Sequence, residues 1–110
     1  MRRLPKRLMP HRNLVSYRPK TGEGAYGPVY GPAVVAKRAA IDDKRRLVRT
    51  PQGRELVAAA RVALDPEHLM PEGSLVTIWR GRPNERERTA VFIETADFDG
   101  LPQFVQITLE

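Results

Sequence analysis

The chain has 110 residues, which is enough for one domain but not for two separate cores. It contains no cysteine, which excludes disulfides and thiolate chemistry. No apolar run approaches the ~18 residues of a membrane span, so we expect no membrane contact. The net charge of +6 favours polyanions such as nucleic acid, or acidic proteins, as partners.

The charge is distributed unevenly along the chain. Residues 1–64 include 15 basic and 4 acidic residues, whereas residues 65–110 include 4 basic and 9 acidic residues. The net charges of these two parts are therefore +11 and −5. Folding either interleaves the two parts and evens out the charge, or leaves a basic face and an acidic face. A molecule of the second kind could stack on copies of itself and turn its basic side toward DNA.

The first twelve residues are basic and contain two prolines. Pro5 and Pro10 prevent a helix of useful length, so residues 1–12 are predicted to form an extended basic arm. A single domain over residues 13–110 follows. The arm is either disordered or ordered only on a partner. Its basic side chains include Arg2, Arg3, Lys6 and Arg7.

The next two segments are predicted to be a short strand and a loop. Residues 13–18 (NLVSYR) form a strand candidate that ends at Pro19. Residues 20–32 (KTGEGAYGPVYGP) contain four glycines and two prolines, which is typical of a loop. Tyr26 and Tyr30 are the only large side chains of this loop. They either pin the loop to the body of the protein or stack on a base.

The middle of the chain is predicted to be a long hairpin. Residues 33–49 form a strand candidate, bent or bulged near Asp42 and Asp43, and residues 50–53 (TPQG) suit a type I turn. Residues 54–64 have the composition of a helix. The tight turn and the strand-like neighbours nevertheless favour a strand, with one face formed by Leu56, Ala58, Ala60, Val62 and Leu64.

The remaining third of the chain is predicted to consist of strands and connections. Strand candidates cover residues 74–80, 89–98 and 103–110; in the last of these Val105, Ile107 and Leu109 share one face. The connections are a turn-rich link, a polar loop and a turn, over residues 65–73, 81–88 and 99–102. We therefore expect an all-β protein, either a small β-barrel or a compact sandwich.

No catalytic or metal-binding set is recognisable in the sequence. His11 and His68 are far apart and have no metal-ligand spacing, so both are interpreted as surface residues. Asp42 and Asp43 are adjacent, and neighbouring residues of a strand point to opposite faces, so we interpret them as local charge balance. The sequence contains no phosphate-binding glycine motif of the Walker or Rossmann type. We expect a protein that is not an enzyme and has no cofactor.

The strongest signal is the positive charge around the turn at residues 50–53. A solvated surface turn would account for it. Alternatively, the arginines meet phosphates without reading sequence, because the hairpin has neither stacking aromatics nor the side chains of a base reader. This alternative makes the protein a sequence-independent nucleic-acid-binding β-barrel. The candidate DNA-facing residues are Lys44, Arg45, Arg46, Arg49, Gln52 and Arg54.

The order of these segments resembles a known family. The resemblance rests on NLVSYR, YGPVYGP, KRRLVRTPQGRE, a P-E-G turn before SLVTIW, and the C-terminal DGLPQFVQITLE. It covers residues 11–110, and LVRTPQGRE and DGLPQ are its most telling segments. The chain is similar to the head-to-tail stopper proteins of long-tailed bacteriophages, also called head-closure or head–tail joining proteins.

The resemblance implies a structural β-barrel subunit of the virion neck, made in the host cytoplasm. Its copies would form a ring, a dodecamer in preference to a hexamer, that retains packaged double-stranded DNA and docks the tail. The ring would lie below the portal or head–tail adaptor and above the tail terminator or tail tube protein. The hairpin over residues 44–55 would project into the channel, and residues 54–64 would be a strand. The Tyr26 and Tyr30 loop and the basic arm would contact neighbouring subunits and rings.

Overall fold

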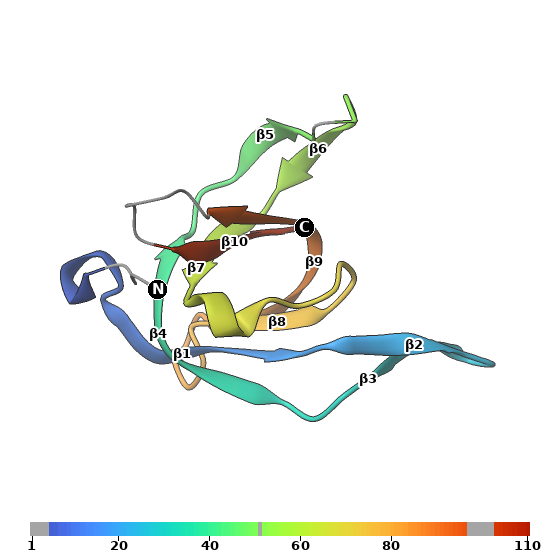
Figure 1. Ribbon diagram of the computed structural model, residues 1–110, viewed down its shortest axis with the longest axis horizontal. Coiled ribbons are helices and arrows are strands. Elements are labelled where there is room, and N and C mark those ends of the chain that lie inside the picture. Colours follow the sequence, from blue (N-terminus) through green and yellow to red (C-terminus); the bar gives the residue numbers. More distant parts are fainter. Residues whose placement is uncertain (1–4, 51, 97–102) are drawn as a thin grey trace.

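The computed structural model of the protein describes residues 5–50, 52–96 and 103–110. Six antiparallel strands close a barrel in the order β1-β4-β7-β10-β9-β8, which confirms the predicted all-β barrel (Figure 1). The described residues contain two short 3-10 turns and no α-helix. The barrel strands are β1 (His11–Arg18), β4 (Val34–Asp42), β7 (Ala60–Leu64), β8 (Leu75–Ile78), β9 (Arg86–Ala96) and β10 (Phe104–Leu109).

The barrel interior is filled by the alternating apolar residues of these strands. Val105, Ile107 and Leu109 of β10 are buried as predicted from their spacing, and Val62 and Leu64 of β7 face them across the ladder. All five belong to one continuous core cluster. Full burial of such a side chain contributes about 1.5–3 kcal/mol, so these strands supply much of the stability of the barrel.

The segment over residues 54–64 is a strand, as predicted, and not a helix. It is divided into β6 (Glu55–Ala58) and β7, with Ala59 between them. β7 pairs with β4 on one side and with β10 on the other. These ladders bury the predicted face of the segment, and this tertiary gain outweighs the helix propensity of its alanines.

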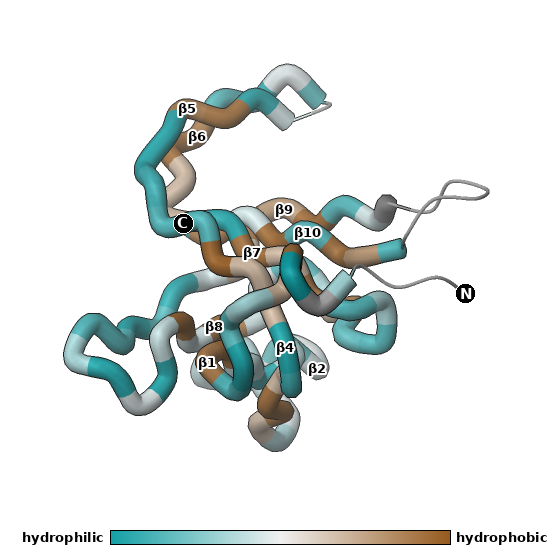
Figure 2. Tube along the Cα trace, turned by 90° about the vertical axis from the view of Figure 1, so that its left-hand side faces the viewer, coloured by the Kyte–Doolittle hydropathy of each residue, from teal (hydrophilic) through white to brown (hydrophobic). Residues whose placement is uncertain are grey.

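The predicted hairpin projects from one end of the barrel. β5 (Arg46–Arg49) pairs with β6, and the two strands stand off the barrel in two perpendicular views (Figures 1 and 2). Residues 43–45 connect β4 to β5, whereas only residues 59 and 60 lie opposite them, between the paired positions of β6 and β7. The extra residue on the first side bends the hairpin relative to the barrel, as predicted. At the tip the Gly53 N–H donates to the Thr50 carbonyl at 2.9 Å, which agrees with the predicted turn.

The loop predicted over residues 20–32 is largely a second hairpin, so that prediction was wrong. β2 (Lys20–Gly24) pairs with β3 (Gly27–Tyr30), and the hairpin extends to the right in Figure 1. Main-chain pairing needs no apolar pattern, and Pro28 is tolerated because both strands of a two-stranded sheet are edges. Tyr26 at the tip is fully exposed and does not hold the hairpin against the barrel. The Cζ atom of Arg18 lies 5.6 Å from the centre of the Tyr30 ring, above its face.

The N-terminal segment differs from the extended arm that was expected. Lys6–Leu8 form one turn of 3-10 helix (η1), and Met9 is fully buried, so the described part of the segment is anchored to the barrel. Arg7 is exposed on this turn. Arg2 and Arg3, and the turn predicted at residues 99–102, lie outside the described residues.

Several strand boundaries also differ from the predictions, and β1 begins at His11, inside the segment predicted to be the arm. β8 ends at Ile78, before Trp79, which has a φ of +57° that a strand does not allow. β9 begins at Arg86, inside the segment predicted to be a polar loop, because Arg86 pairs with Ile78 of β8. The link after β7 contains the 3-10 turn η2 (Pro66–His68). No helix of the described residues has the length and hydropathy needed to cross a bilayer.

Candidate functional site

The hairpin cations divide into neutralised and free groups. Arg46 donates to Asp42 at 2.7 Å, and Arg49 donates to Glu55 at 2.5 Å. Lys44, Arg45 and Arg54 make no ion pair or side-chain hydrogen bond with any described residue, and Gln52 is exposed beside the turn. The free positive charge of the hairpin therefore lies at its base, on residues 44 and 45, and near its tip, on Arg54.

The two faces of the hairpin differ. Val48, Leu56 and Ala58 are buried and pack against Val91 of β9, which holds the hairpin on the barrel. On the other face, Leu47 and Val57 are cross-strand neighbours with exposed fractions of 68% and 50%. Figure 2 shows that both strands of the hairpin contain apolar residues. The hairpin thus combines free cations with an exposed apolar face that the sequence analysis did not identify.

A network of polar side chains occupies the barrel end from which the hairpin rises. The Asp43 carboxylate accepts a hydrogen bond from Trp79 Nε1 at 2.9 Å and another from Arg86. Partial burial acts to raise the pKa of Asp43, but these hydrogen bonds and the charges of Arg86 and Arg88 outweigh it and lower the pKa. Asp42 therefore pairs with its neighbour Arg46, as the local charge-balance interpretation predicted, whereas Asp43 pairs with the distant Arg86.

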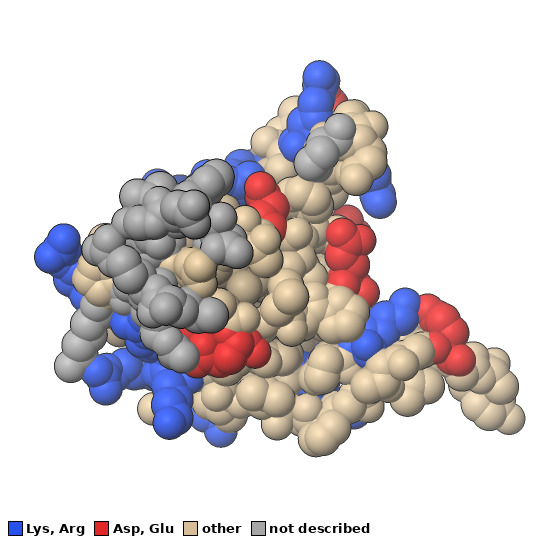
Figure 3. Space-filling view, in the orientation of Figure 1, with Lys and Arg blue, Asp and Glu red and all other residues tan. Residues whose placement is uncertain are grey.

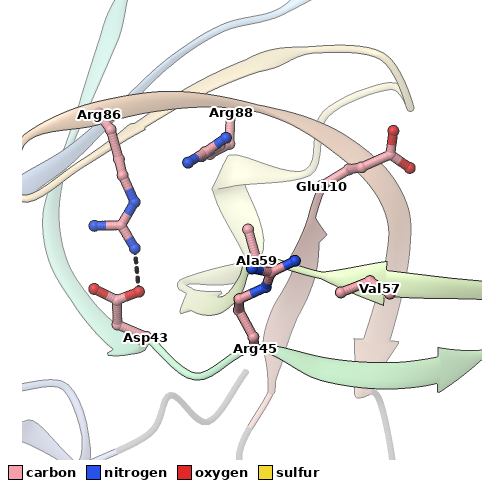
Figure 4. Close-up of a pocket in the computed structure, with 7 residues that line it drawn as sticks. All are labelled: Asp43, Arg45, Val57, Ala59, Arg86, Arg88 and Glu110. Atoms are coloured by element: carbon pink, nitrogen blue, oxygen red, sulfur yellow. Dashed lines mark hydrogen bonds and ion pairs between the residues drawn. The ribbon is translucent and has the colours of Figure 1, made fainter.

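A depression of about 370 Å³ lies beside this network. Its lining residues are Asp43, Arg45, Val57, Ala59, Arg86, Arg88 and Glu110 (Figure 4). Arg86 and Arg88 share a strand face with buried Ala90, so both reach inward over the barrel end. Arg45 and Arg88 have no hydrogen-bond or ion-pair partner among the described residues, so they are available for carboxylate or phosphate oxygens.

Arg86 and Arg88 were missed because residues 81–88 were interpreted as a loop. The signal was the alternation of arginine with glutamate at residues 85–88, immediately before an apolar strand. The other predicted contact residues lie elsewhere: Arg7 is on η1, Tyr26 is at the tip of the second hairpin, and Figure 1 shows these segments apart from β5 and β6. The structure therefore does not join the predicted contact residues into one surface.

Both histidines are partly exposed, and each also makes a specific contact within the fold. His11 Nδ1 accepts a hydrogen bond from the Ile41 N–H at 3.0 Å, and the imidazole packs edge-on against Trp79. His68 Nδ1 lies 3.1 Å from the Tyr17 hydroxyl. Both histidines therefore contribute to folding contacts. No cluster of three or more metal-ligating side chains occurs among the residues that the structure describes.

Acidification is expected to destabilise the barrel through His11. Burial lowers the pKa of this imidazole from 6.5, so the unfolded chain binds the proton more readily than the folded chain. The stabilisation is complete above pH 6.5 and is lost as the pH falls toward the folded-state pKa. Urea titrations should show a lower free energy of unfolding at pH 5.5 than at pH 7.5.

The matched control for this experiment is His11→Asn, whose amide oxygen can accept the Ile41 N–H without titrating. The drop in the free energy of unfolding between pH 7.5 and pH 5.5 should be smaller in this variant than in the wild type. An equal drop in both proteins would show that His11 does not cause it.

Comparison with known proteins adds no further assignment. No family model, curated protein or solved structure matches the chain. The argument for function therefore rests on the residues and geometry described above.

Proposed function

We propose that the protein is a structural subunit of the neck of a long-tailed phage, a head-to-tail stopper or head-closure protein. The observation that carries the proposal is the β5–β6 hairpin, which stands off a closed barrel and bears free cations at its base and near its tip. Figure 3 shows basic side chains gathered toward the outer end of this hairpin. The resemblance of residues 11–110 to the stopper family supports the same role.

The free cations suit contact with DNA that does not depend on sequence. Double-stranded DNA carries about one negative charge per 1.7 Å of its axis. A ring of copies, with Lys44 and Arg54 facing a channel, would surround packaged DNA with positive charge that a single copy does not supply. The described part of the hairpin has no aromatic side chain for stacking on bases, so phosphates are the matching partners.

The remaining elements supply contacts within the neck in this proposal. The exposed Tyr26 at the tip of the second hairpin and the exposed Arg7 would meet neighbouring subunits or rings. The partners would be the portal or adaptor above the ring and the tail terminator or tail tube protein below it. A dodecameric ring would place the hairpin of each copy around one channel.

Electron microscopy of purified, DNA-filled particles from the source tests the proposal. The expected result is a symmetric ring of this protein between portal and tail, with residues 44–55 lining the channel. A ring with the hairpin turned outward would retain the stopper role but remove the explanation of the cations. Absence of the protein from such particles would refute the neck role.

The second candidate is a nucleic-acid-binding β-barrel that acts on its own. Arg45 and Arg88, which are free to bind anions in the depression at the barrel end, favour it. It requires that the isolated protein bind duplex DNA with an affinity that falls as the salt concentration rises. The logarithm of the binding constant should fall by about 0.9 per phosphate contact for each tenfold increase in salt concentration. Lack of binding at low salt would exclude this candidate.

A further inference from the structure

Two exposed surfaces of the molecule have matching chemistry and opposite charge. We define the basic docking surface as Leu47, Val57, Arg45 and Arg88. Its apolar pair is exposed on the hairpin, and Val57 also lines the depression that holds the two arginines, so the four side chains form one continuous surface. Glu110 also lines the depression, and Figure 4 shows its side chain directed away from both arginines.

The second surface is apolar with an acidic rim. We define the acidic docking surface as Leu69, Pro71, Glu72 and Ile93. These residues, together with Met70, line an open hollow of about 470 Å³, and Leu69 has an exposed fraction of 61%. Glu72 is exposed and forms no ion pair with a described residue.

The two surfaces lie at opposite ends of β8. The segment that carries Leu69–Glu72 leads into the first residue of β8, whereas Arg86 and the depression lie beside its last residue, Ile78. One molecule therefore cannot bring its own two surfaces together. Two copies can, if the basic surface of one meets the acidic surface of the next.

We infer that this chain self-associates head to tail, with the basic docking surface of one copy on the acidic docking surface of the next copy. Leu47 and Val57 would enter the hollow beside Leu69 and Ile93, while Arg45 and Arg88 would approach Glu72. This inference deepens the ring assembly proposed above and rests on that assembly, but it requires nothing about DNA or the virion. Contacts between two different surfaces close into a ring when the rotation per copy divides a full turn.

A second copy fits the basic surface better than DNA does. A phosphate backbone would meet the arginines but would leave the exposed Leu47 and Val57 against water or charge. The acidic surface supplies the Glu72 carboxylate and an apolar hollow together. Figure 3 shows acidic side chains on the body of the molecule between the two hairpins.

Charge reversal tests the inference on the full-length protein. Arg88→Glu and Glu72→Arg each make the two surfaces repel, so each should require roughly tenfold or more protein to assemble than the wild type does. The double variant, and an equimolar mixture of the two single variants, should both recover assembly because each again brings opposite charges together. Sedimentation velocity across a concentration series measures the assembly.

Two further variants keep the result interpretable. Leu47→Ser with Val57→Ser should weaken assembly while leaving the unfolding midpoint nearly unchanged, because both side chains are exposed. Lys37→Glu makes the same charge change as Arg88→Glu on an exposed residue of β4 outside both surfaces, and it should assemble normally.

Three outcomes would overturn the inference: single variants that assemble like the wild type, a double variant as weak as the singles, or a wild type that stays monomeric at all concentrations. These outcomes differ from failure of the neck role. If the protein is absent from particles but the charge exchange restores assembly, the docking surfaces stand and the neck role fails.

Discussion

Replacing Ile107 with alanine is expected to lower the free energy of unfolding by about 2–5 kcal/mol. Ile107 is fully buried in the barrel, where its strand pairs with β7 on one side and β9 on the other. Its neighbours are fixed by two ladders and cannot move inward without breaking them, so the substitution should leave a cavity. Urea denaturation measures the change.

The control for this substitution lies next to it on the same strand. Gln106→Ala removes a side chain that is only half-buried and should change the free energy of unfolding by no more than about 0.5 kcal/mol. If Ile107→Ala costs as little as Gln106→Ala, the barrel interior is not packed as described.

Replacing Lys44 and Arg54 together with alanine is expected to impair retention of packaged DNA in particles. Both residues lack an ion-pair partner in the described chain, so their loss removes charge available to phosphates without breaking a contact of the fold. The free energy of unfolding should change by no more than about 0.5 kcal/mol. The measurements are the fraction of DNA-filled particles, by electron microscopy, and the infectious titre.

The double variant Arg46→Ala with Arg49→Ala is the matched control. It makes the same change in net charge, but it removes arginines that already pair with Asp42 and Glu55. If direct phosphate contact matters, this control should retain more DNA than the Lys44 and Arg54 variant. Equal losses of packaged DNA in the two variants would indicate that only the overall electrostatic field of the hairpin matters. Normal DNA-filled particles from both variants would contradict a DNA-facing hairpin.

The pairing of arginines with acids changes how the basic turn is interpreted. In the sequence the charges around residues 50–53 look like one positive cluster. In the folded hairpin two of the arginines are neutralised, and the exposed Leu47 and Val57 form an apolar face between them. A hairpin of this kind can contact a protein through its face and an anion through its free cations.

The sequence by itself determined the all-β class and the central hairpin. Val105, Ile107 and Leu109 alternate with polar residues because one face of a strand is buried, and the turn at residues 50–53 carries its own glycine. The tight turn and the strand-like neighbours predicted a strand over residues 54–64 against a helix-favouring composition. These features depend on residues that are close together in the sequence, so the sequence pattern is enough to predict them.

Only the tertiary structure decided which distant residues meet. The hairpin over residues 20–30 is held by main-chain hydrogen bonds, which leave no apolar pattern in the side chains. Arg86 meets Asp43 from 43 positions away, and His11 becomes a structural acceptor because β1 pairs with β4, which brings the Ile41 N–H to its imidazole. Contacts of this kind depend on which strands become neighbours in the barrel, and no local pattern of the sequence contains that information.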